Sequence, residues 1–390
     1  MARRAVIVEA VRSPFTKGKE GGALAAVHPV DLFAKTLQAL ITRTGIAPDR
    51  IDDLIAGCVI QVGEQAANIA RQAWLAAGLP PSVPGVTIDR KCGSAQQAID
   101  FAAQGIIAGA YDLVVAGGVE MMSRVPMKAN RLGKDNLGPM FHAVYPEGLV
   151  HQGISAELIA ARWRLGRPAL DAFALRSHRR AAAAAARGSL EQEIEPIEGV
   201  SRDEGIRADS SIERLAALKT SFEDPAMAAR FPEIRWSVTA GNASQVSDGA
   251  SAILLAEEKV AERLGLRARA ALSHFAVAGD DPIMMLTGII PATRKLLNRA
   301  AIGIDDIDRF EVNEAFASVV LAWLDETGAD PERVNVDGGA IAFGHPVGAS
   351  GGRLMMSLVR GLEESGGRRG LVTMCESGGM ANATLIERLG

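Results

Sequence analysis

The sequence predicts an α/β fold in which helices cover a mostly buried sheet. The first observation is an alternation of short apolar, β-branched runs, such as "RAVIVEA" (4–10) and "GVTID" (85–89), with Ala-rich amphipathic segments, such as "SAQQAIDFAAQGIIAG" (94–109). Alternation of this kind is typical of α/β layering. The second observation is that the same alternation of apolar runs and amphipathic segments returns near the end of the chain. The third is the length of 390 residues, which is enough to bury a large core.

The first half of the chain supplies the clearest run of elements. Strands are expected in 4–10, 52–61, 85–89 and 112–120, and helices in 32–45, 69–78 and 94–109. The C-terminal part repeats this order, with helical patterns in 291–303 and 348–365 and strand-like runs in 307–312 and 370–376. The segments 111–123 and 369–386 both read as a strand, a glycine pair and a methionine. We interpret this similarity as a duplicated half.

The amino-acid composition changes between residues 120 and 249, where Arg, Pro, Gly and Asn are frequent and buried-strand patterns are few. One helix is expected there, in "DAFALRSHRRAAAAAARGS" (171–189), because alanine has the highest helix propensity. We therefore expect an N-terminal half (1–119 and 250–270), a large loop insertion (120–249) and a C-terminal half (271–390).

Composition and charge exclude several classes of protein. The formal net charge is -4, and Lys and Arg are spread along the chain, so no nucleic-acid-binding patch is indicated. No run approaches the roughly 18 apolar residues of a membrane span, and the N-terminal run is interrupted by Glu9 and Arg12, unlike a secretory signal. We therefore expect a soluble, cytoplasmic protein. The three cysteines lie far apart without a C-x-x-C pair, which argues against disulfides and zinc fingers.

Cys92 lies in "VTIDRKCGSAQQAID" (86–100), where a strand-like run stops and a helical pattern begins. If the helix begins at Gly93 or Ser94, its unpaired N–H groups and positive dipole end face the sulfur and favour the thiolate. Cys92 is then a candidate nucleophile. The alternative is that it acts as a small buried hydrophobe, as free cysteines often do.

A glycine-rich segment, "VNVDGGAIAFGHPVGASGGR" (334–353), carries His345 in a loop before another helical pattern. A loop with little side-chain bulk can present an imidazole to a pocket as a general base. The alternative is a structural histidine. The segment lacks the ending of a P-loop and the full dinucleotide-binding pattern, so a nucleotide fingerprint is not supported.

Two further strand ends carry chemistry. Cys375 ends an apolar run and is followed by Ser377 and two glycines, as at the Cys92 junction. Asn313 and Glu314 follow a second apolar run, just before a helical one. The alternative for these two residues is a helix N-cap.

Together these segments resemble the thiolase family over essentially the whole chain. The matching stretches are "DRKCGSAQQA" (89–98), "TAGNASQVSDGA" (239–250), "EVNEAFA" (311–317), "GGAIAFGHPVGASG" (338–351) and "CESGGM" (375–380). The resemblance implies a duplicated, five-layered α-β-α-β-α fold with mixed sheets and a CoA-binding loop insertion. It also implies reversible cleavage of a 3-ketoacyl-CoA by CoA to acetyl-CoA and a shortened acyl-CoA, or the reverse Claisen condensation. Such an enzyme belongs to fatty acid metabolism and lipid degradation.

The resemblance also assigns roles. Cys92 would be the acylated nucleophile, His345 the base that takes its proton, and Cys375 the acid/base at the α-carbon of acetyl-CoA. One oxyanion would be stabilised by His345 and a water held by Asn313. The other would be stabilised by the backbone N–H groups of Cys92 and Ser377.

Contacts to coenzyme A follow from the same resemblance. Ser244 and Ala240 would face the pantetheine arm, and Lys219 would lie near the adenine or phosphates. His151, in "HQGISAEL" (151–158), would line the substrate near the thioester, with an ordinary loop residue as the alternative. Met285 would lie on the acyl side. Coenzyme A is expected as a substrate, with no further cofactor and no metal, in a homodimer or homotetramer.

The chain departs from the family pattern at a few positions. Ser377 and Ala381 stand where glycines are common, which raises the question of the loop geometry there. Leu286 and Ile289 depart from a Met-Gly-x-Gly-Pro pattern on the acyl side, from which we hypothesise an unusual substrate shape.

The sequence argues against three rival functions. A decarboxylating ketosynthase would carry a histidine in place of Asn313. A catalytically weak, thiolase-like acyl-CoA-binding protein or partner subunit would be expected to lose Cys92, His345 or Cys375, and all three are present. A metalloprotein that uses these three residues lacks the short ligand spacings of zinc sites.

Overall fold

The structure, a computed structural model, describes residues 3–390. Its strands form one continuous mixed sheet in the order β4-β3-β5-β6-β1-β7-β10-β9-β8, and the short β2 pairs with β6. The first half supplies β1 (Ala5–Arg12), β2 (Thr16–Lys17), β3 (Asp53–Gly57), β4 (Gly85–Ile88), β5 (Leu113–Met121) and β6 (Ser247–Glu257). The second half supplies β7 (Ala270–Gly279), β8 (Arg309–Val312), β9 (Arg369–Glu376) and β10 (Met380–Arg388).

The expected duplication is confirmed by the strand order. The order β3-β5-β6-β1 in the first half returns as β8-β9-β10-β7 in the second. In each set the first pair is parallel and the next two pairs are antiparallel. β1 and β7 join the two sets, with Ala5 opposite Leu272.

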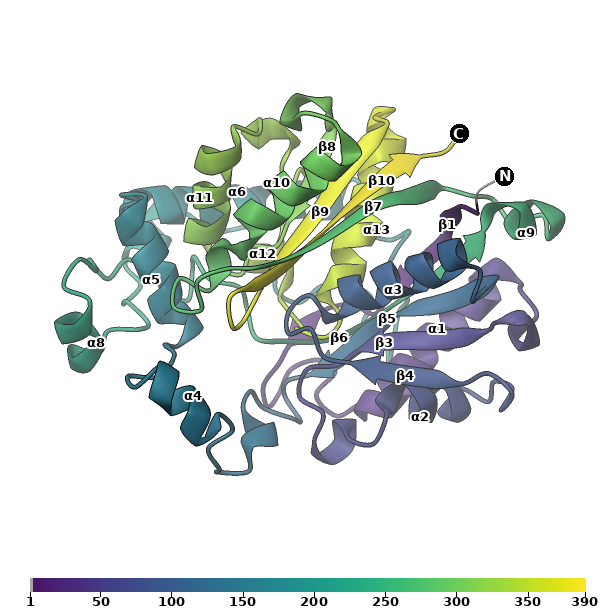
Figure 1. Ribbon diagram of the computed structural model, residues 1–390, viewed down its shortest axis with the longest axis horizontal. Helices are drawn as coiled ribbons and strands as arrows, with labels where there is room; N and C mark the ends of the chain where they lie inside the picture. The colour runs from purple at the N-terminus through teal and green to yellow at the C-terminus, as the bar shows by residue number, and fades with distance from the viewer. Residues whose placement is uncertain (1–2) are drawn as a thin grey trace.

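Helices divide the fold into five layers, as expected (Figure 1). α1 (Pro29–Thr44) and α2 (Ile69–Ala76) cover the outer face of the first set of strands. α3 (Ser94–Ala108) and α13 (Ser350–Ser365) lie between the two sets and contact each other. α10 (Ile289–Ala300) and α11 (Ala317–Thr327) cover the outer face of the second set.

The alternation of side chains along each strand explains this layering. On β9, Leu371 and Cys375 point to the outer core with α10 and α11, whereas Val372 and Met374 point to the middle core with α3 and α13. Successive side chains of a strand face opposite sides of the sheet, so a strand that is covered on both faces must be apolar throughout. This is why the strands read as continuous apolar runs in the sequence.

Between β5 and β6 the chain forms a long excursion. It contains α4 (Gly138–Val144), α5 (Gln152–Arg162), α6 (Arg167–Ala186), α7 (Ile212–Ala216) and α8 (Pro225–Arg230). α6 confirms the helix expected in 171–189. α5 and α6 pack against α11, whereas α4 and α8 lie at the periphery (Figure 1). Two short helices complete the fold, α9 (Glu258–Arg263) and α12 (Ala340–Phe343).

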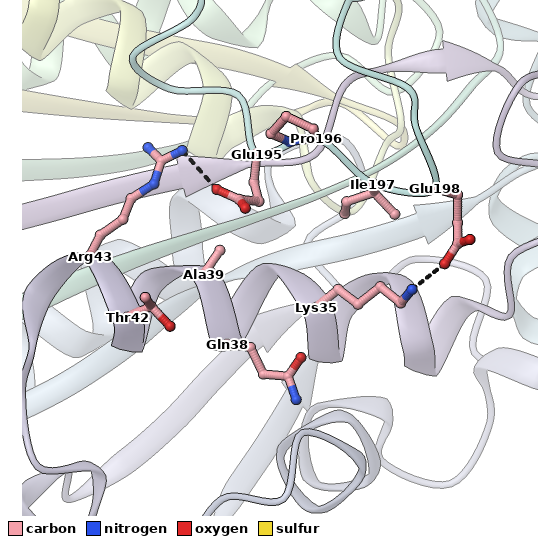
Figure 2. A pocket seen from close by; sticks show the side chains of 9 residues that line it. All are labelled: Lys35, Gln38, Ala39, Thr42, Arg43, Glu195, Pro196, Ile197 and Glu198. Carbon is pink, nitrogen blue, oxygen red and sulfur yellow. Dashed lines mark hydrogen bonds and ion pairs between the residues drawn. The ribbon is translucent and has the colours of Figure 1, made fainter.

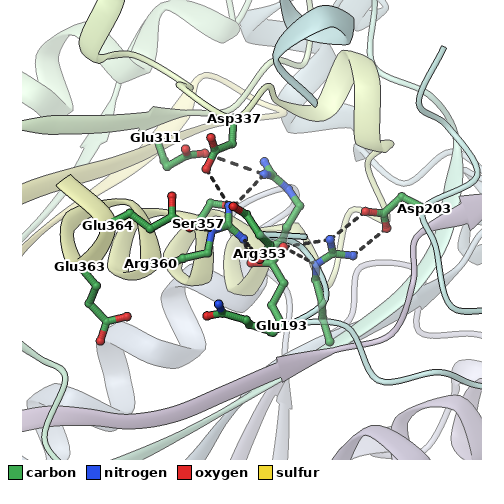
Figure 3. A network of polar contacts seen from close by, with 12 residues as sticks. Glu193, Asp203, Glu311, Asp337, Arg353, Ser357, Arg360, Glu363 and Glu364 are labelled. Atoms are coloured by element: carbon green, nitrogen blue, oxygen red, sulfur yellow. Dashed lines mark hydrogen bonds and ion pairs between the residues drawn. The ribbon is translucent and has the colours of Figure 1, made fainter. Parts of the chain in front are cut away.

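A buried network of charges fastens this excursion to both halves (Figure 3). Arg12 on β1 binds Asp203 through two hydrogen bonds of 2.7 and 2.8 Å and also pairs with Glu193 at 2.9 Å. Arg360 on α13 pairs with Glu193 at 2.6 Å and with Asp337 at 2.8 Å. Buried charges are stable only when they are paired, so these contacts fix the relative position of the elements that carry them.

Two cavities lie away from the strand ends that bear the predicted site. One, of about 310 Å³, lies between α1 and residues 195–198, with ion pairs Lys35–Glu198 and Arg43–Glu195 at its two ends (Figure 2). The other, of about 290 Å³, is lined by parts of β1, α13 and the Arg267–Arg269 segment. Within residues 3–390, every helix is too short or too polar to span a bilayer.

Candidate active site

Four residues predicted from the sequence gather where strands of both halves end. Asn313 directly follows β8, and Cys375 is the second-last residue of the parallel neighbour β9. The Asn313 N–H donates to the carbonyl of Thr373 on β9 at 3.1 Å, so the two strand ends are adjacent. Cys92 precedes α3, and His345 lies between α12 and α13. All four are at most 5% exposed.

Cys92 lies at the beginning of α3, as the sequence indicated. The helix begins at Ser94, and its N-cap is Gly93, which has no capping side chain. Burial nevertheless raises the pKa of Cys92 to about 12, with a smaller contribution from Glu376, whereas a hydrogen bond from its own backbone lowers it. At neutral pH the residue is therefore a thiol, and a base must take its proton before it can attack.

His345 is anchored so that one ring nitrogen remains free to act as that base. Its Nδ1 lies 2.6 Å from the hydroxyl oxygen of Ser350, which donates its own hydrogen to the carbonyl of Pro346 at 2.9 Å. Because that hydrogen is already donated, the hydroxyl oxygen must accept from Nδ1–H. This assigns the lone pair to Nε2, which lies 3.5 Å from the side-chain nitrogen of Asn313.

The charge state of His345 agrees with this assignment. Burial lowers its pKa to about 3, and the positive charge of Arg353 lowers it further. The imidazole is therefore neutral at physiological pH, and its Nε2 lone pair is not occupied by a proton. The backbone N–H of His345 donates to the carbonyl of Gln245 at 2.9 Å, which holds the loop against the chain that leads into β6.

Cys375 and Asn313 complete the arrangement. Burial raises the pKa of Cys375, and the neighbouring Cys92 raises it further, whereas a hydrogen bond with Asn313 lowers it. Cys375 is therefore a protonated thiol that can donate to a carbanion. The side-chain oxygen of Asn313 is buried and has no hydrogen-bond partner within residues 3–390. An unpaired buried acceptor of this kind is suited to a water molecule or a polar group of a ligand.

The N-cap alternative for Asn313 and Glu314 is wrong. α11 begins at Ala317, and its N-cap is Phe316. Glu314 instead accepts hydrogen bonds from Ser177 at 2.6 Å and Asn335 at 3.0 Å. Tertiary contacts thus hold Glu314 inside the fold, and Asn313 alone faces His345.

The turn after Cys375 does not need a glycine at position 377. The left-handed positions of this turn are Gly378, with φ of 92°, and Gly379, with φ of 78°, whereas Ser377 lies outside that region. A side chain at Ser377 is therefore compatible with the backbone. Ala381 pairs with Cys375 across β9 and β10, and its Cβ lies 3.3 Å from where a Cβ on Gly288 would be. The methyl group of Ala381 thus packs against the Gly288 backbone.

The residues expected to bind coenzyme A fall into two groups. Lys219 and Ala240 are exposed, and the bridge between Thr220 and Thr239 brings them to opposite positions. Ser244 is half-buried, and its N–H donates to the carbonyl of Ala315 at 2.9 Å, close in sequence to Asn313. Lys219 and Ala240 therefore lie at the surface, and Ser244 lies deeper, toward the buried site.

The other two expected contacts have structural partners of their own. His151 caps α5 by accepting from the Gly153 N–H at 3.1 Å, and its ring lies 5.3 Å from that of Phe222. Met285 is 2% exposed and belongs to the same apolar cluster as Cys375. Leu286 and Ile289 are also buried in that cluster, so their side chains pack within the apolar core.

Sequence reasoning missed three residues that support the site, namely Ser350, Glu376 and Asn382. Ser350 anchors His345, as described above. Asn382 donates to the carbonyl of Gly93 at 3.1 Å, and the carboxyl group of Glu376 lies against the same glycine. Ser350 could have been found as a hydroxyl residue at the start of the helix that follows His345. The other two had no local signal. Within residues 3–390, no three His, Cys, Asp or Glu side chains are placed to hold a metal ion.

Comparisons with known proteins agree with this architecture. Residues 5–259 match the family model of the thiolase N-terminal domain, and residues 266–388 match that of the thiolase C-terminal domain. A steroid 3-ketoacyl-CoA thiolase, FadA6, of Mycobacterium tuberculosis is 48% identical over 99% of this chain and 94% of its own length. A beta-ketoadipyl-CoA thiolase of Pseudomonas aeruginosa is 42% identical over 100% of both chains. The crystal structure of an acetyl-CoA acetyltransferase from Bacillus anthracis superimposes with a TM-score of 0.88 at 38% identity, over 100% of this chain and 99% of that one.

Proposed function

Because the chain belongs to the thiolase family, and is an acyltransferase that converts a 3-ketoacyl-CoA and CoA to acetyl-CoA and a shortened acyl-CoA, we propose that Cys92 carries the acyl group during this exchange. The observation that carries this proposal is the gathering of two buried thiols, a neutral imidazole and an amide at adjoining strand ends.

In the first half-reaction His345 takes the proton of Cys92. Its Nε2 lone pair accepts the proton, while Ser350 holds Nδ1–H. The Cys92 sulfur then attacks the 3-keto carbonyl carbon, and the bond between the α- and β-carbons breaks. Its electron pair leaves with the acetyl-CoA fragment, and the rest of the substrate stays on Cys92 as a thioester. One difficult step is thereby divided into two easier ones.

The acetyl-CoA fragment leaves as an enolate that needs a proton. Cys375 donates that proton to the α-carbon, since its raised pKa keeps it protonated until the carbanion forms. The enolate oxygen is stabilised by His345, now protonated on Nε2, and by a water held by Asn313. The backbone N–H groups of Cys92 and Ser377 stabilise the oxyanion of the tetrahedral intermediate.

The second half-reaction reverses these steps with a new thiol. CoA binds with Ser244 and Ala240 beside its pantetheine arm and Lys219 near its phosphates. His151 lines the substrate near the thioester, and Met285 lies on the acyl side. Cys375, left as a thiolate by the first half-reaction, accepts the CoA proton, and the CoA sulfur attacks the acyl-Cys92 thioester. The bond between the acyl carbon and the Cys92 sulfur then breaks, acyl-CoA leaves, and the Cys92 thiolate takes back its proton from Nε2 of His345. CoA is therefore a substrate, and the residues of the site supply the chemistry without a further cofactor.

The acyl group is proposed to be bulky, with a ring or a ring-derived branch. The support is the identity of 48% to a relative that is named as a steroid 3-ketoacyl-CoA thiolase. A panel of straight-chain and ring-bearing 3-ketoacyl-CoA substrates tests this. A kcat/KM that is highest for straight chains would contradict it. A homodimer or homotetramer and a cytoplasmic location are proposed with it.

A Cys92→Ser variant tests the nucleophile. The loss of acetoacetyl-CoA absorbance measures the rate of thiolysis. We expect this rate to fall by about 10³-fold or more, with the fold retained. Cys58→Ser is the matched control, because Cys58 is also a buried thiol, but its sulfur lies 3.9 Å from Glu120 and belongs to a different core cluster from that of Cys92. Mass spectrometry after incubation with acyl-CoA should place the adduct on Cys92. An adduct elsewhere, or full turnover of Cys92→Ser, would exclude the assignment.

A further inference from the structure

The mechanism above leaves one buried acid at the site unused. Glu376 directly follows Cys375 at the end of β9 and is 0% exposed. Neither of its carboxyl oxygens has a hydrogen-bond partner within the described part of the chain. A buried carboxyl group without partners costs stability, so its presence calls for a role or a partner that depends on its protonation.

The carboxyl group lies against the turn that bears Cys92. A Cβ on Gly93 would be 2.1 Å from a carboxyl oxygen of Glu376 and 2.9 Å from the side-chain nitrogen of Asn382. That nitrogen donates to the carbonyl of Gly93 at 3.1 Å, whereas the side-chain oxygen of Asn382 has no partner. A protonated carboxyl group is the kind of donor that this oxygen lacks.

The charges around Glu376 decide when it carries its proton. Burial raises its pKa to about 8; Arg90 lowers it, and Asp100 on α3 and Asp89 raise it. Glu376 is thus largely neutral at neutral pH and becomes charged as the pH rises through about 8. Once charged, it raises the pKa of Cys92, which lies next to Gly93.

We propose that Glu376 is a positioning residue for Cys92. As the neutral acid it donates to Asn382 and keeps the Asn382 amide on the Gly93 carbonyl. As the carboxylate it places a negative charge beside Cys92 and opposes loss of the thiol proton. This inference rests on the proposed role of Cys92 as nucleophile and adds a contact from the opposite half of the fold.

The first test measures the thiol alone, without substrate. The rate of Cys92 alkylation by iodoacetamide, followed by mass spectrometry, reports the thiolate as the pH is raised from about 6 to about 10. Glu376→Gln keeps the size of the side chain and an N–H donor for Asn382 but cannot be charged. We expect its alkylation profile to lie roughly one pH unit lower than that of the unaltered protein. Glu387→Gln, a carboxyl group on β10 far along the strand from the site, is the matched control and should show no shift.

The second test separates position from charge. Glu376→Ala removes the donor to Asn382, so thiolysis at pH 7 should fall by roughly tenfold, and Glu376→Gln should restore most of it. In the unaltered protein, acylation should decline above about pH 8, and in Glu376→Gln it should not. If Glu376→Ala does not fold, the Gln variant and its alkylation profile decide alone.

The outcomes are distinct. An alkylation profile of Glu376→Gln that coincides with that of the unaltered protein, or an equal shift in Glu387→Gln, would overturn the inference. A shifted alkylation profile without any thiolysis in the unaltered protein would leave the inference standing and refute the proposed function instead.

Discussion

The Ser350→Ala variant tests how the site prepares its base. Ser350 is 0% exposed, and its oxygen accepts from Nδ1–H of His345 at 2.6 Å. Alanine leaves that N–H buried without an acceptor, which costs about 1–3 kcal/mol. The ring can escape this cost by moving its hydrogen to Nε2. That tautomer would point an N–H at the amide nitrogen of Asn313 and remove the lone pair that takes the Cys92 proton.

The expected result is a fall in the rate of Cys92 acylation by about 10- to 100-fold, since 1.4 kcal/mol corresponds to tenfold. Stopped-flow measurement of the first turnover with acetoacetyl-CoA isolates this step from the later transfer to CoA. Ser357→Ala is the matched control, because Ser357 lies on the same helix, is also buried, and contacts Arg353 at 3.4 Å without touching His345. A Ser350→Ala enzyme that acylates as fast as the Ser357→Ala enzyme would refute the tautomer assignment.

Three further predictions concern packing and pH. Arg360→Met removes one cationic partner from each of the buried carboxylates Glu193 and Asp337, so chemical denaturation should show a loss of about 3 kcal/mol in the free energy of unfolding. An unchanged denaturation midpoint would contradict a stabilising role for these two ion pairs. Gly93→Ala places a Cβ 2.1 Å from the carboxyl group of Glu376, so thiolysis should fall sharply, whereas a Gly166→Ala control, with φ of -76° and the nearest atom at 3.6 Å from the added Cβ, should retain it; equal activity of the two variants would disprove the close contact. Burial raises the pKa of Asp100 to about 8, above its unfolded value, so its contribution to stability is present at low pH and is lost as the pH rises toward 8. Asp100→Asn should therefore stabilise the protein more at pH 8 than at pH 5 in parallel denaturant titrations, and a pH-independent effect would argue against the raised pKa.

Much of the fold could be predicted from the sequence because its signals are local. A strand covered on both faces must be apolar throughout, so β5 and β9 were visible as uninterrupted runs. The repeated order of strand, glycine pair and methionine revealed the duplication. The start of α3 just after Cys92 could likewise be predicted, since a helix start can be recognised from the few residues around it.

What only the tertiary structure decided depends on residues far apart in the chain. The pairing of β1 with β7 joins the two halves into one sheet, and no local pattern encodes it. Asn313 is by residue type equally suited to a helix N-cap, and only the start of α11 at Ala317 and the contact with His345 distinguish the two roles. The contact of Asn382 with Gly93 spans 289 positions of the sequence. Burial then determines the charge of each group, because the cost of ionisation depends on the surrounding dielectric and on neighbouring charges, which exist only once the chain has folded.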